Sequence, residues 1–194
     1  MSWHNLFVLS LFAYLIGSLP FGLMIANVKN CDIRKKGSGN IGASNVYRVM
    51  GPGYGICVFI LDVFKGFIPT FLCMILTNNA WLHIAVGLCS VLGHTFSIFA
   101  KFKGGKGVAT SAGMLLALHP LVFFIMCPAT LIAIKLIKIV APCSIAAAII
   151  TPLLLSYLNA PIAYITFTGV LAIFIIWTHK ANIKRLINGE EISI

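Results

Sequence analysis

The sequence predicts an all-α integral membrane protein, a polytopic bundle of transmembrane helices. Of its 194 residues, 60% are hydrophobic and only 9% are charged, whereas a soluble domain usually carries about 25% charged residues. The apolar residues gather in runs close to the roughly 20 residues that a helix needs to cross the hydrocarbon core. Because so few charges cannot cover a globular surface, lipid must cover part of it.

The apolar runs predict seven transmembrane segments, some of them short. They cover residues 3–28, 54–77, 80–100, 108–118, 121–137, 141–158 and 161–178. The piece 108–118 is too short for a full crossing without help from its flanks, and a half-helix buried against its neighbours is compatible with it. In a five-span alternative, residues 108–137 form a hairpin or one bent element. No polar linker separates two halves, so we expect a single domain over residues 1–194.

The basic residues predict the orientation. They gather in residues 29–53, 101–107, 135–138 and 180–185, and the opposite connections contain no Lys or Arg. Because Lys and Arg mark cytoplasmic loops, we expect the N-terminus outside and the C-terminus in the cytoplasm in either path. Of the 14 basic residues, only Lys65 then falls in the interior of a span, because Lys135 lies within the last three residues of the span 121–137. Asp62 lies three residues before it, a spacing that allows an ion pair and so offsets the cost of burying charge.

Composition also excludes several classes of function. A net charge of +10 would suggest nucleic acid in a soluble protein, but here the basic residues flank apolar runs without interleaved aromatics, so no nucleic-acid partner is expected. The six cysteines form no C-x-x-C pair, and His and Cys do not cluster at ligand spacing. We therefore expect neither a metal site nor a cofactor.

The first polar motif is GSGNIGASNVYR, at Gly37–Arg48. It contains G-x-G-x-x-G, but no strand precedes it, so a dinucleotide site is not supported. The glycines let the backbone approach a ligand, and a short helix that begins near Ala43 would offer N–H groups suited to a phosphate. Asn45 and Arg48 share a face of that helix. The alternative interpretation is a glycine-rich turn between spans.

The second motif is GH at 93–94 followed by FKGGKGVAT at 102–110. It is not a P-loop, because the first glycine and the Ser/Thr of that motif are missing. A flexible Gly-Gly-Lys-Gly at the start of an apolar helix still places the ammonium of Lys106 where anions bind. The alternative, a Lys that snorkels from a helix end, fits Lys101 and Lys103 better than Lys106.

The third motif leaves the last span, from His179 to Glu191. At helical spacing His179, Asn182 and Arg185 lie on one broad face. The alternative is a solvated amphipathic tail.

In this order, the three motifs resemble the bacterial acyl-phosphate-dependent glycerol-3-phosphate acyltransferases, the PlsY family. The matching residues are GSGNIGASNVYR, GH…FKGGKGVAT and H-x-x-N-I-x-R-L-x-x-G-x-E, with Asp62-x-x-Lys65-Gly66 and Ser144. Ser44 stands where the family usually has Thr, and the stretch before Ser144 differs from the family's Ser/Gly-rich sequence.

The resemblance implies an enzyme of phospholipid biosynthesis. It would transfer a fatty acyl group from acyl phosphate to the 1-hydroxyl of sn-glycerol 3-phosphate, giving lysophosphatidic acid and phosphate. Its partners would be these two substrates, membrane lipids and, as a further candidate, the soluble enzyme that makes acyl phosphate. It would lie in the bacterial cytoplasmic (inner) membrane as a multi-pass protein with its active site facing the cytoplasm.

The resemblance also implies site residues. The catalytic candidates are Lys106, which would neutralise charge on the acyl phosphate, His179 and Asn182, which would orient the glycerol substrate, and Ser38. Whether His179 or the substrate's own phosphate takes the proton stays open. Candidates for substrate and phosphate binding are Gly37, Gly39, Asn40, Gly42, Asn45, Arg48, Gly104, Gly105, Ser144, Lys184, Arg185 and Glu191.

Two other classes of function compete with this interpretation. A transporter for phosphate or another organic anion would also use basic glycine-rich motifs, but it should offer polar groups to both faces and often shows an inverted repeat. Here all motif charge lies on one predicted side. A structural membrane subunit leaves the basic glycine-rich loops unexplained.

Overall fold

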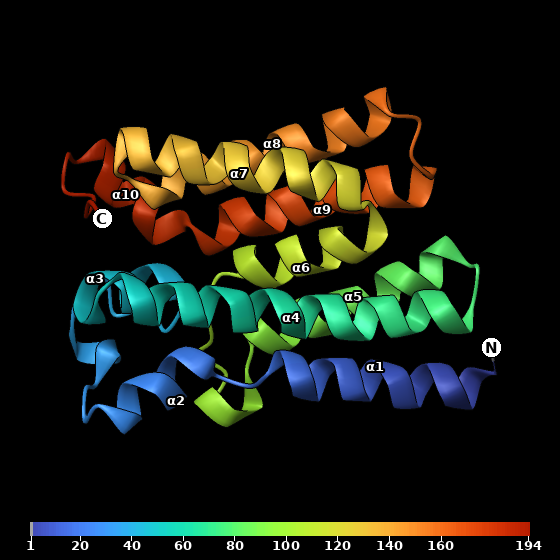
Figure 1. Cartoon of the computed structure of the whole chain (residues 1–194), viewed down its shortest axis with the longest axis horizontal. Coiled ribbons are helices and arrows are strands. Elements are labelled where there is room, and N and C mark those ends of the chain that lie inside the picture. The colour runs from blue at the N-terminus through green and yellow to red at the C-terminus, as the bar shows by residue number, and fades with distance from the viewer. Residues whose placement is uncertain (1) are drawn as a thin grey trace. The chain divides into compact units, whose positions relative to one another are not determined.

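The computed structural model describes residues 2–194, and in these residues it contains helices and loops but no strand (Figure 1). The chain divides into two compact units, one that ends at Leu118 and one over His119–Ile194. The all-helical class predicted from composition is confirmed.

The first unit contains six α-helices and two short 3₁₀ turns. The α-helices are α1 (Trp3–Gly17), α2 (Phe21–Val28), α3 (Ala43–Met50), α4 (Pro52–Leu76), α5 (Ala80–Thr95) and α6 (Val108–Leu118); the 3₁₀ turns are Ile33–Lys35 and Ile98–Ala100. Several boundaries follow from local chemistry. The Asn79 side chain accepts the Trp81 N–H and so caps α5, and Pro52 opens α4, where its missing N–H costs nothing.

The predicted first span, residues 3–28, is broken in the structure. Helix α1 ends at Gly17, and α2 begins at Phe21 after Ser18, Leu19 and Pro20. Proline has no N–H to continue an α-helical ladder, and the carbonyl of Leu19 accepts the Phe21 N–H and the ammonium of a lysine of α4. The apolar run continues through this interruption, so hydropathy alone did not predict it.

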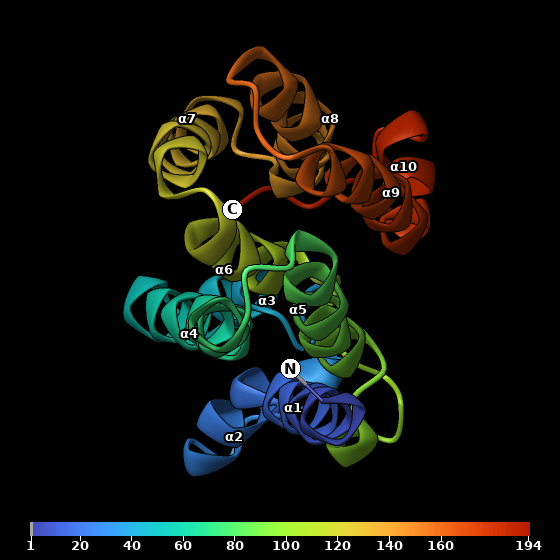
Figure 2. The same cartoon turned by 90° about the vertical axis from the view of Figure 1, so that its right-hand side faces the viewer.

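Small residues set the spacing between helices of the first unit, in which α4 lies beside α6 and α1 lies beside α5 (Figure 2). A Cβ on Gly66 of α4 would collide with the Thr110 carbonyl of α6, and one on Gly113 of α6 would collide with the Val63 carbonyl of α4. The same holds for α1 and α5, where Gly17 lies against the backbone of Ser90. Such backbone approach is typical of helix packing in membranes.

The second unit contains three long helices and a short one. They are α7 (Pro120–Ile137), α8 (Val140–Tyr157), α9 (Ile162–Thr178) and α10 (Lys180–Ile187), with a bend of 58° between α9 and α10 at His179. Large apolar side chains cover much of the outside of these helices; in α7 only Val122 and Met126 are buried. Such a surface suits a hydrocarbon environment rather than water.

Length and composition support five to six membrane spans among the described residues. The helical stretches that qualify are Trp3–Val28 (α1 with α2), Pro52–Leu76, Ala80–Ala100 (α5 with the 3₁₀ turn after it), Pro120–Ile137 and Val140–Tyr157. The bent pair of α9 and α10 also qualifies if it is taken as one span. Helix α6 is apolar but has only 11 residues. The predicted segment 108–118 therefore exists as a helix, but this helix is too short to cross the membrane alone.

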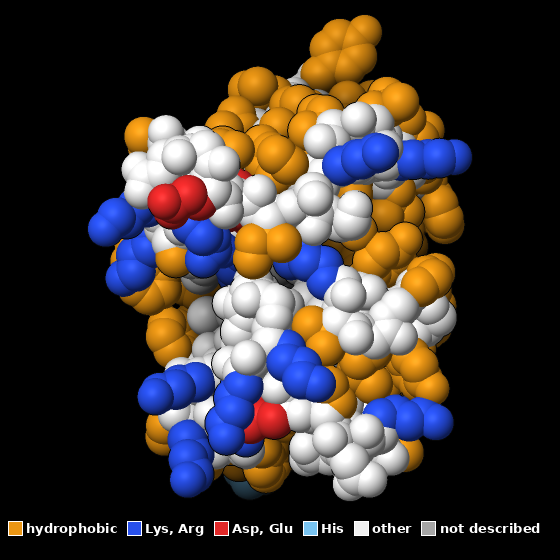
Figure 3. All heavy atoms as spheres, turned by 90° about the vertical axis from the view of Figure 1, so that its left-hand side faces the viewer, with side chains coloured by type: hydrophobic (Ala, Val, Ile, Leu, Met, Phe, Trp, Pro, Cys, Tyr) orange, Lys and Arg blue, Asp and Glu red, His pale blue; other side chains and the backbone are white. Residues whose placement is uncertain are grey.

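Charge gathers at one end of the helices within each unit. In the first unit, the segments that connect α2 to α3 lie at the end of α4 opposite the turn at 77–79; in the second, the turn at Lys138 and helix α10 lie opposite the turn at 158–161 (Figure 1). Figure 3 looks onto the end with the many Lys and Arg side chains. This segregation agrees with the loop charges from which the orientation was predicted; the sides occupied by the termini stay a prediction.

Candidate functional site

The first glycine loop (residues 37–42) is held in shape by the side chain of Asn45. The amide oxygen of Asn45 accepts the Ser38 N–H at 2.8 Å, and its nitrogen donates to the carbonyls of Ile33 and Lys36 at 3.0 and 3.1 Å. Asn45 is completely buried, and Gly37, with a φ of 58°, lies so close that a Cβ would overlap the Asn45 oxygen. Asn45 was predicted to bind phosphate; the structure shows all of its polar atoms engaged by the loop itself.

Helix α3 follows this loop and begins at Ala43, as predicted. The Asn40 side chain accepts the Gly42 N–H at 2.8 Å, and the Gly42 carbonyl receives the first helical bonds. An apolar cluster of Ala26, Ile33, Ile41, Val46 and Val58 anchors loop and helix on α2 and α4. Ser38 and Arg48 are half-buried on this framework.

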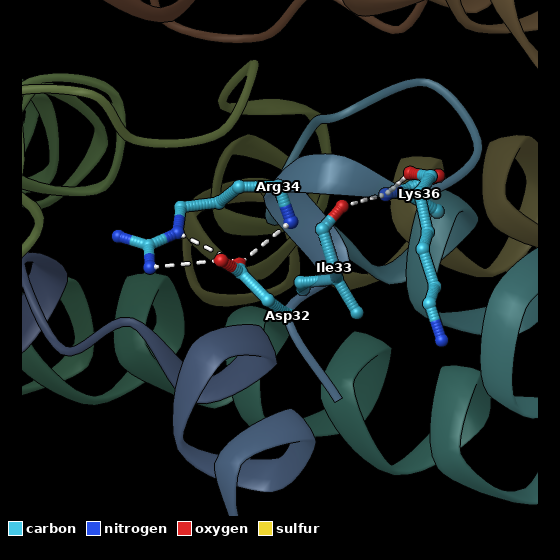
Figure 4. Close-up of polar contacts among 5 residues, drawn as sticks. Asp32, Ile33, Arg34 and Lys36 are labelled. Atoms are coloured by element: carbon cyan, nitrogen blue, oxygen red, sulfur yellow. Dashed lines mark hydrogen bonds and ion pairs between the residues drawn. The ribbon is translucent and has the colours of Figure 1, made fainter. Parts of the chain in front are cut away.

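An exposed ion pair lies just before the first loop (Figure 4). Asp32 accepts the Arg34 N–H at 3.2 Å, and its two oxygens accept Nε and NH2 of Arg34 at 2.9 and 3.3 Å. The hydrogen bonds from Arg34 hold the pKa of the Asp32 carboxyl below its usual range. One of the cations before the loop is therefore already paired, and the lysines at 35 and 36 stay exposed.

The second glycine loop (residues 101–107) is held by the main chain of α5. The N–H groups of Gly104 and Gly105 donate to the carbonyls of Thr95 and His94 at 3.0 and 3.1 Å. These two amides were predicted to help bind phosphate, but their hydrogen bonds already hold the loop. Lys106 follows them, half-buried, one residue before Gly107, whose φ of 83° turns the chain into α6.

Beside this loop the structure brings together three buried ionisable side chains. Lys65 Nζ lies 2.7 Å from Asp62 Oδ1, and the His94 Nδ1 lies 3.7 Å from the same oxygen. The sequence predicted the Asp62–Lys65 pair from its spacing, and the structure confirms that pair. It did not predict that His94 joins it; the only signal was that His94 opens the second motif.

The third motif, in the second unit, is organised by Glu191. Its carboxylate accepts the Asn182 amide through one oxygen and Arg185 Nε at 2.9 Å through the other, and its side chain is only 2% exposed. This geometry orients Asn182 and Arg185, and the predicted contact of Glu191 with substrate stays a prediction. Lys184, in the last turn of α10, precedes Arg185.

His179 sits at the bend between α9 and α10 and is 2% exposed. Its Nδ1 lies 2.8 Å from the Ile175 carbonyl, which can only accept, so Nδ1 carries the hydrogen. In the neutral ring the lone pair is then on Nε2. Ser144, near the start of α8, is buried at 3% exposure.

The predicted site residues are divided between the two compact units of the chain. The loops that carry Ser38 and Lys106 belong to the first unit; His179, Asn182, Arg185 and Glu191 belong to the second. Among residues 2–194, no group of three or more His, Cys, Asp or Glu side chains could hold a metal ion. What this fold and these motifs define is a multi-helix membrane protein with basic, glycine-rich loops.

Comparison with known proteins identifies the class. Residues 7–189 match the family model described as glycerol-3-phosphate acyltransferase. The glycerol-3-phosphate acyltransferase of Listeria monocytogenes serovar 1/2a is 42% identical over 190 residues, which cover 96% of each chain. The chain therefore belongs to the glycerol-3-phosphate acyltransferase family, as the three motifs indicated.

Solved structures agree with this assignment. The crystal structure of PlsY, an integral membrane glycerol 3-phosphate acyltransferase, in its glycerol 3-phosphate form matches with a TM-score of 0.93 at 40% identity, covering 98% of this chain and 96% of that one. The lysophosphatidic acid form matches with a TM-score of 0.91 at 39% identity, covering 98% and 95%.

Proposed function

We propose that this protein transfers a fatty acyl group from an acyl phosphate to the 1-hydroxyl of sn-glycerol 3-phosphate. The hydroxyl oxygen attacks the acyl carbonyl carbon, the bond from that carbon to the phosphate oxygen breaks, and the hydroxyl proton passes to a base. The products are lysophosphatidic acid and inorganic phosphate. The observation that carries the proposal is the family match over residues 7–189, since all three motifs lie within it or reach its end.

The first glycine loop is proposed to hold a phosphate group. The Asn45 brace fixes the loop before any ligand arrives, which lowers the ordering cost of binding. Ser38 Oγ and the Arg48 guanidinium supply hydrogen bonds and charge from the loop and from α3. Because Arg presents a planar fork of donors, it suits a phosphate oxygen pair.

Lys106 is proposed to stabilise charge at the reacting carbonyl. As the tetrahedral intermediate forms, negative charge grows on its oxygen and on the departing phosphate. A fixed cation that meets this charge acts mainly in the transition state, and removal of such a donor typically costs about 10²–10³ in rate. The short hydrogen-bonded tether of Gly104 and Gly105 to α5 keeps its backbone in place.

His179 and Asn182 are proposed to orient the glycerol substrate, with Arg185 and Lys184 adding phosphate binding. The Nδ1 hydrogen on the Ile175 carbonyl leaves Nε2 as the atom able to accept a hydroxyl proton. If His179 is the base, His179→Asn should cost about 10²–10⁴ in kcat. If it only orients the substrate, the same change should chiefly raise KM.

We further propose that the charged end of each unit faces the cytoplasm of a bacterial inner membrane. Support comes from the segregation of Lys and Arg to one end of the helices, the pattern of cytoplasmic loops. Cysteines introduced at Ser38 and at Asn159 should then label from opposite sides of the membrane. Labelling of both from the same side would overturn this orientation.

The direct test uses purified protein in detergent. Labelled glycerol 3-phosphate and palmitoyl phosphate should give labelled lysophosphatidic acid, and acyl-CoA in place of palmitoyl phosphate should give little. The matched control is Lys106→Ala protein from the same preparation. Turnover with acyl-CoA and none with acyl phosphate would contradict the proposed donor.

A further inference from the structure

Three buried side chains lie behind the second glycine loop. Asp62 and Lys65, on successive turns of α4, are each 3% exposed, and His94, on α5, is 6% exposed. Lys65 Nζ also donates to the Leu19 carbonyl at 3.0 Å and lies 5.6 Å from the centre of the Phe21 ring. One ammonium therefore ties α4 to the break between α1 and α2.

The cluster has no room for substrate. Asp62, Lys65 and His94 line, together with residues of the α1–α2 break, a cavity of about 10 Å³, roughly the space of a single water molecule. This space does not hold an acyl or glycerol group, so the cluster can act on the reaction through what it touches. Stability alone is a weak explanation, because buried ion pairs are often matched or exceeded by apolar residues of similar size.

What the cluster touches is the loop that carries Lys106. A Cβ on Gly105 would overlap His94 Nε2 and lie 2.8 Å from Cε1, so the imidazole ring rests against the Gly105 backbone. The main chain of the same histidine accepts the Gly105 N–H, and Thr95 accepts that of Gly104. His94 thus faces Asp62 with one ring nitrogen and the loop with the other.

We propose that Asp62, Lys65 and His94 are positioning residues that set the place of the Lys106 ammonium through the contact of His94 with Gly105. Lys65 compensates the buried Asp62 charge, the Asp62 carboxylate lies 3.7 Å from Nδ1 of the His94 ring and attracts that side of it, and the ring fixes the loop one residue before Lys106. This inference rests on the proposed role of Lys106. A displacement of about 1 Å at a reacting centre can cost on the order of 10²-fold in rate.

The first experiment compares two buried histidines of the same helix. His94→Ala should lower kcat by up to about 10²-fold, with little change in the KM for glycerol 3-phosphate, because the substrate-binding residues are not displaced. His83→Ala is the matched control: His83 is 5% exposed on α5 and bonds the Thr77 carbonyl at 2.7 Å, about three helical turns from the loop. It should keep wild-type kcat. Equal kcat in the two variants would overturn the proposal.

A double-mutant cycle tests whether His94 acts through Lys106. In a Lys106→Ala background, His94→Ala should cause little further loss of kcat, because residues that act as a unit are not additive. Losses that multiply would overturn the proposal. If Lys106→Ala alone keeps wild-type kcat, the proposed role of Lys106 fails. Hydrogen exchange then decides the positioning role by itself: faster exchange of residues 101–107 in His94→Ala than in His83→Ala supports it, and equal exchange refutes it.

Two further variants guard against misfolding. Asp62→Asn/Lys65→Met removes both charges together and avoids the large penalty of one unpaired buried ion; kcat should fall while the unfolding temperature is largely kept. Gly105→Ala adds a methyl group against His94. It should cost more activity in the wild type than in the His94→Ala background, where the removed ring leaves space for it. Wild-type kcat in both variants would contradict the proposal.

Discussion

The two glycine loops of the first unit are stabilised in opposite ways. The loop at 37–42 depends on one side chain, Asn45, which satisfies three backbone groups. The loop at 101–107 depends on main-chain bonds to the end of α5 and on glycines that lie at contact distance. Removal of the Asn45 side chain should therefore break the first loop, whereas a methyl group added at Gly104 should break the second. In both cases, buried contacts between a few atoms determine the conformation of the loop.

The largest effect is expected for Lys106, the half-buried cation of the second loop. Lys106→Ala should lower kcat by about 10²–10³ with smaller effect on KM. Lys106→Arg should rescue it poorly, because a broad planar fork does not replace a compact ammonium. Steady-state kinetics at saturating acyl phosphate measures this, with the exposed Lys103→Ala as control. Similar kcat in the Lys106→Ala and Lys103→Ala proteins would remove Lys106 from the site.

The next effect tests whether added atoms break the second loop. A Cβ on Gly104 would collide with the His94 carbonyl and lie 2.6 Å from the Thr95 oxygen. Gly104→Ala should displace the loop and lower kcat by about 10²-fold. Gly53→Ala is the control, because no other group lies within 4 Å of the place that its methyl carbon would take. Equal activities of the two variants would remove the distinction between the loops.

Removal of atoms should break the first loop. Asn45→Ala leaves the Ser38 N–H and two carbonyls without their partner, at a cost of about 1–3 kcal/mol in unfolding free energy. The unfolding temperature should fall and the KM for glycerol 3-phosphate should rise. Asn40→Ala, which loses one bond in the same loop, should do less. A larger loss in Asn40→Ala would show that the brace lies elsewhere.

The smallest effect concerns the exposed pair before the first loop. Since Arg34 lowers the pKa of Asp32 in the folded protein, the pair stabilises above the unfolded-state pKa of the carboxyl. That contribution is lost as pH falls through the lowered folded-state value. Asp32→Asn should therefore lower the unfolding temperature slightly at neutral pH and in low salt, with the difference vanishing in acid. A difference that grows in acid would contradict the sign.

Local spacing made part of this molecule predictable. Run length located the spans, the i,i+3 spacing located the Asp62–Lys65 pair, and the glycine-rich stretch located the start of α3 at Ala43. Three long motifs in register were enough to indicate the family. These features depend only on residues that are close together along the chain, and the sequence shows those residues directly.

Contacts within the protein that depend on packing were not predicted, and the substrate contacts of these residues stay predictions. The partners of Asn45 lie in a loop whose path the sequence does not define, so its amide was assigned to phosphate. Glu191 was assigned the same way, although it folds back on Asn182 and Arg185. His94 meets Asp62 only because α4 and α5 pack side by side. Whether Ser38, Lys106 and His179 contact substrate stays a prediction.

The glycine contacts between α4 and α6 determine which amino-acid substitutions these helices tolerate. Because Gly66 and Gly113 bring backbone against backbone, the separation of the two helices is fixed by main-chain atoms, which no substitution can shorten. Lipid-facing positions such as Phe64 or Ile68 can exchange one apolar side chain for another without moving α6. One methyl group at either glycine instead pushes α6 aside as a rigid rod, and the loop at its start moves with it. Mutational freedom should therefore differ sharply between the two faces of a single helix.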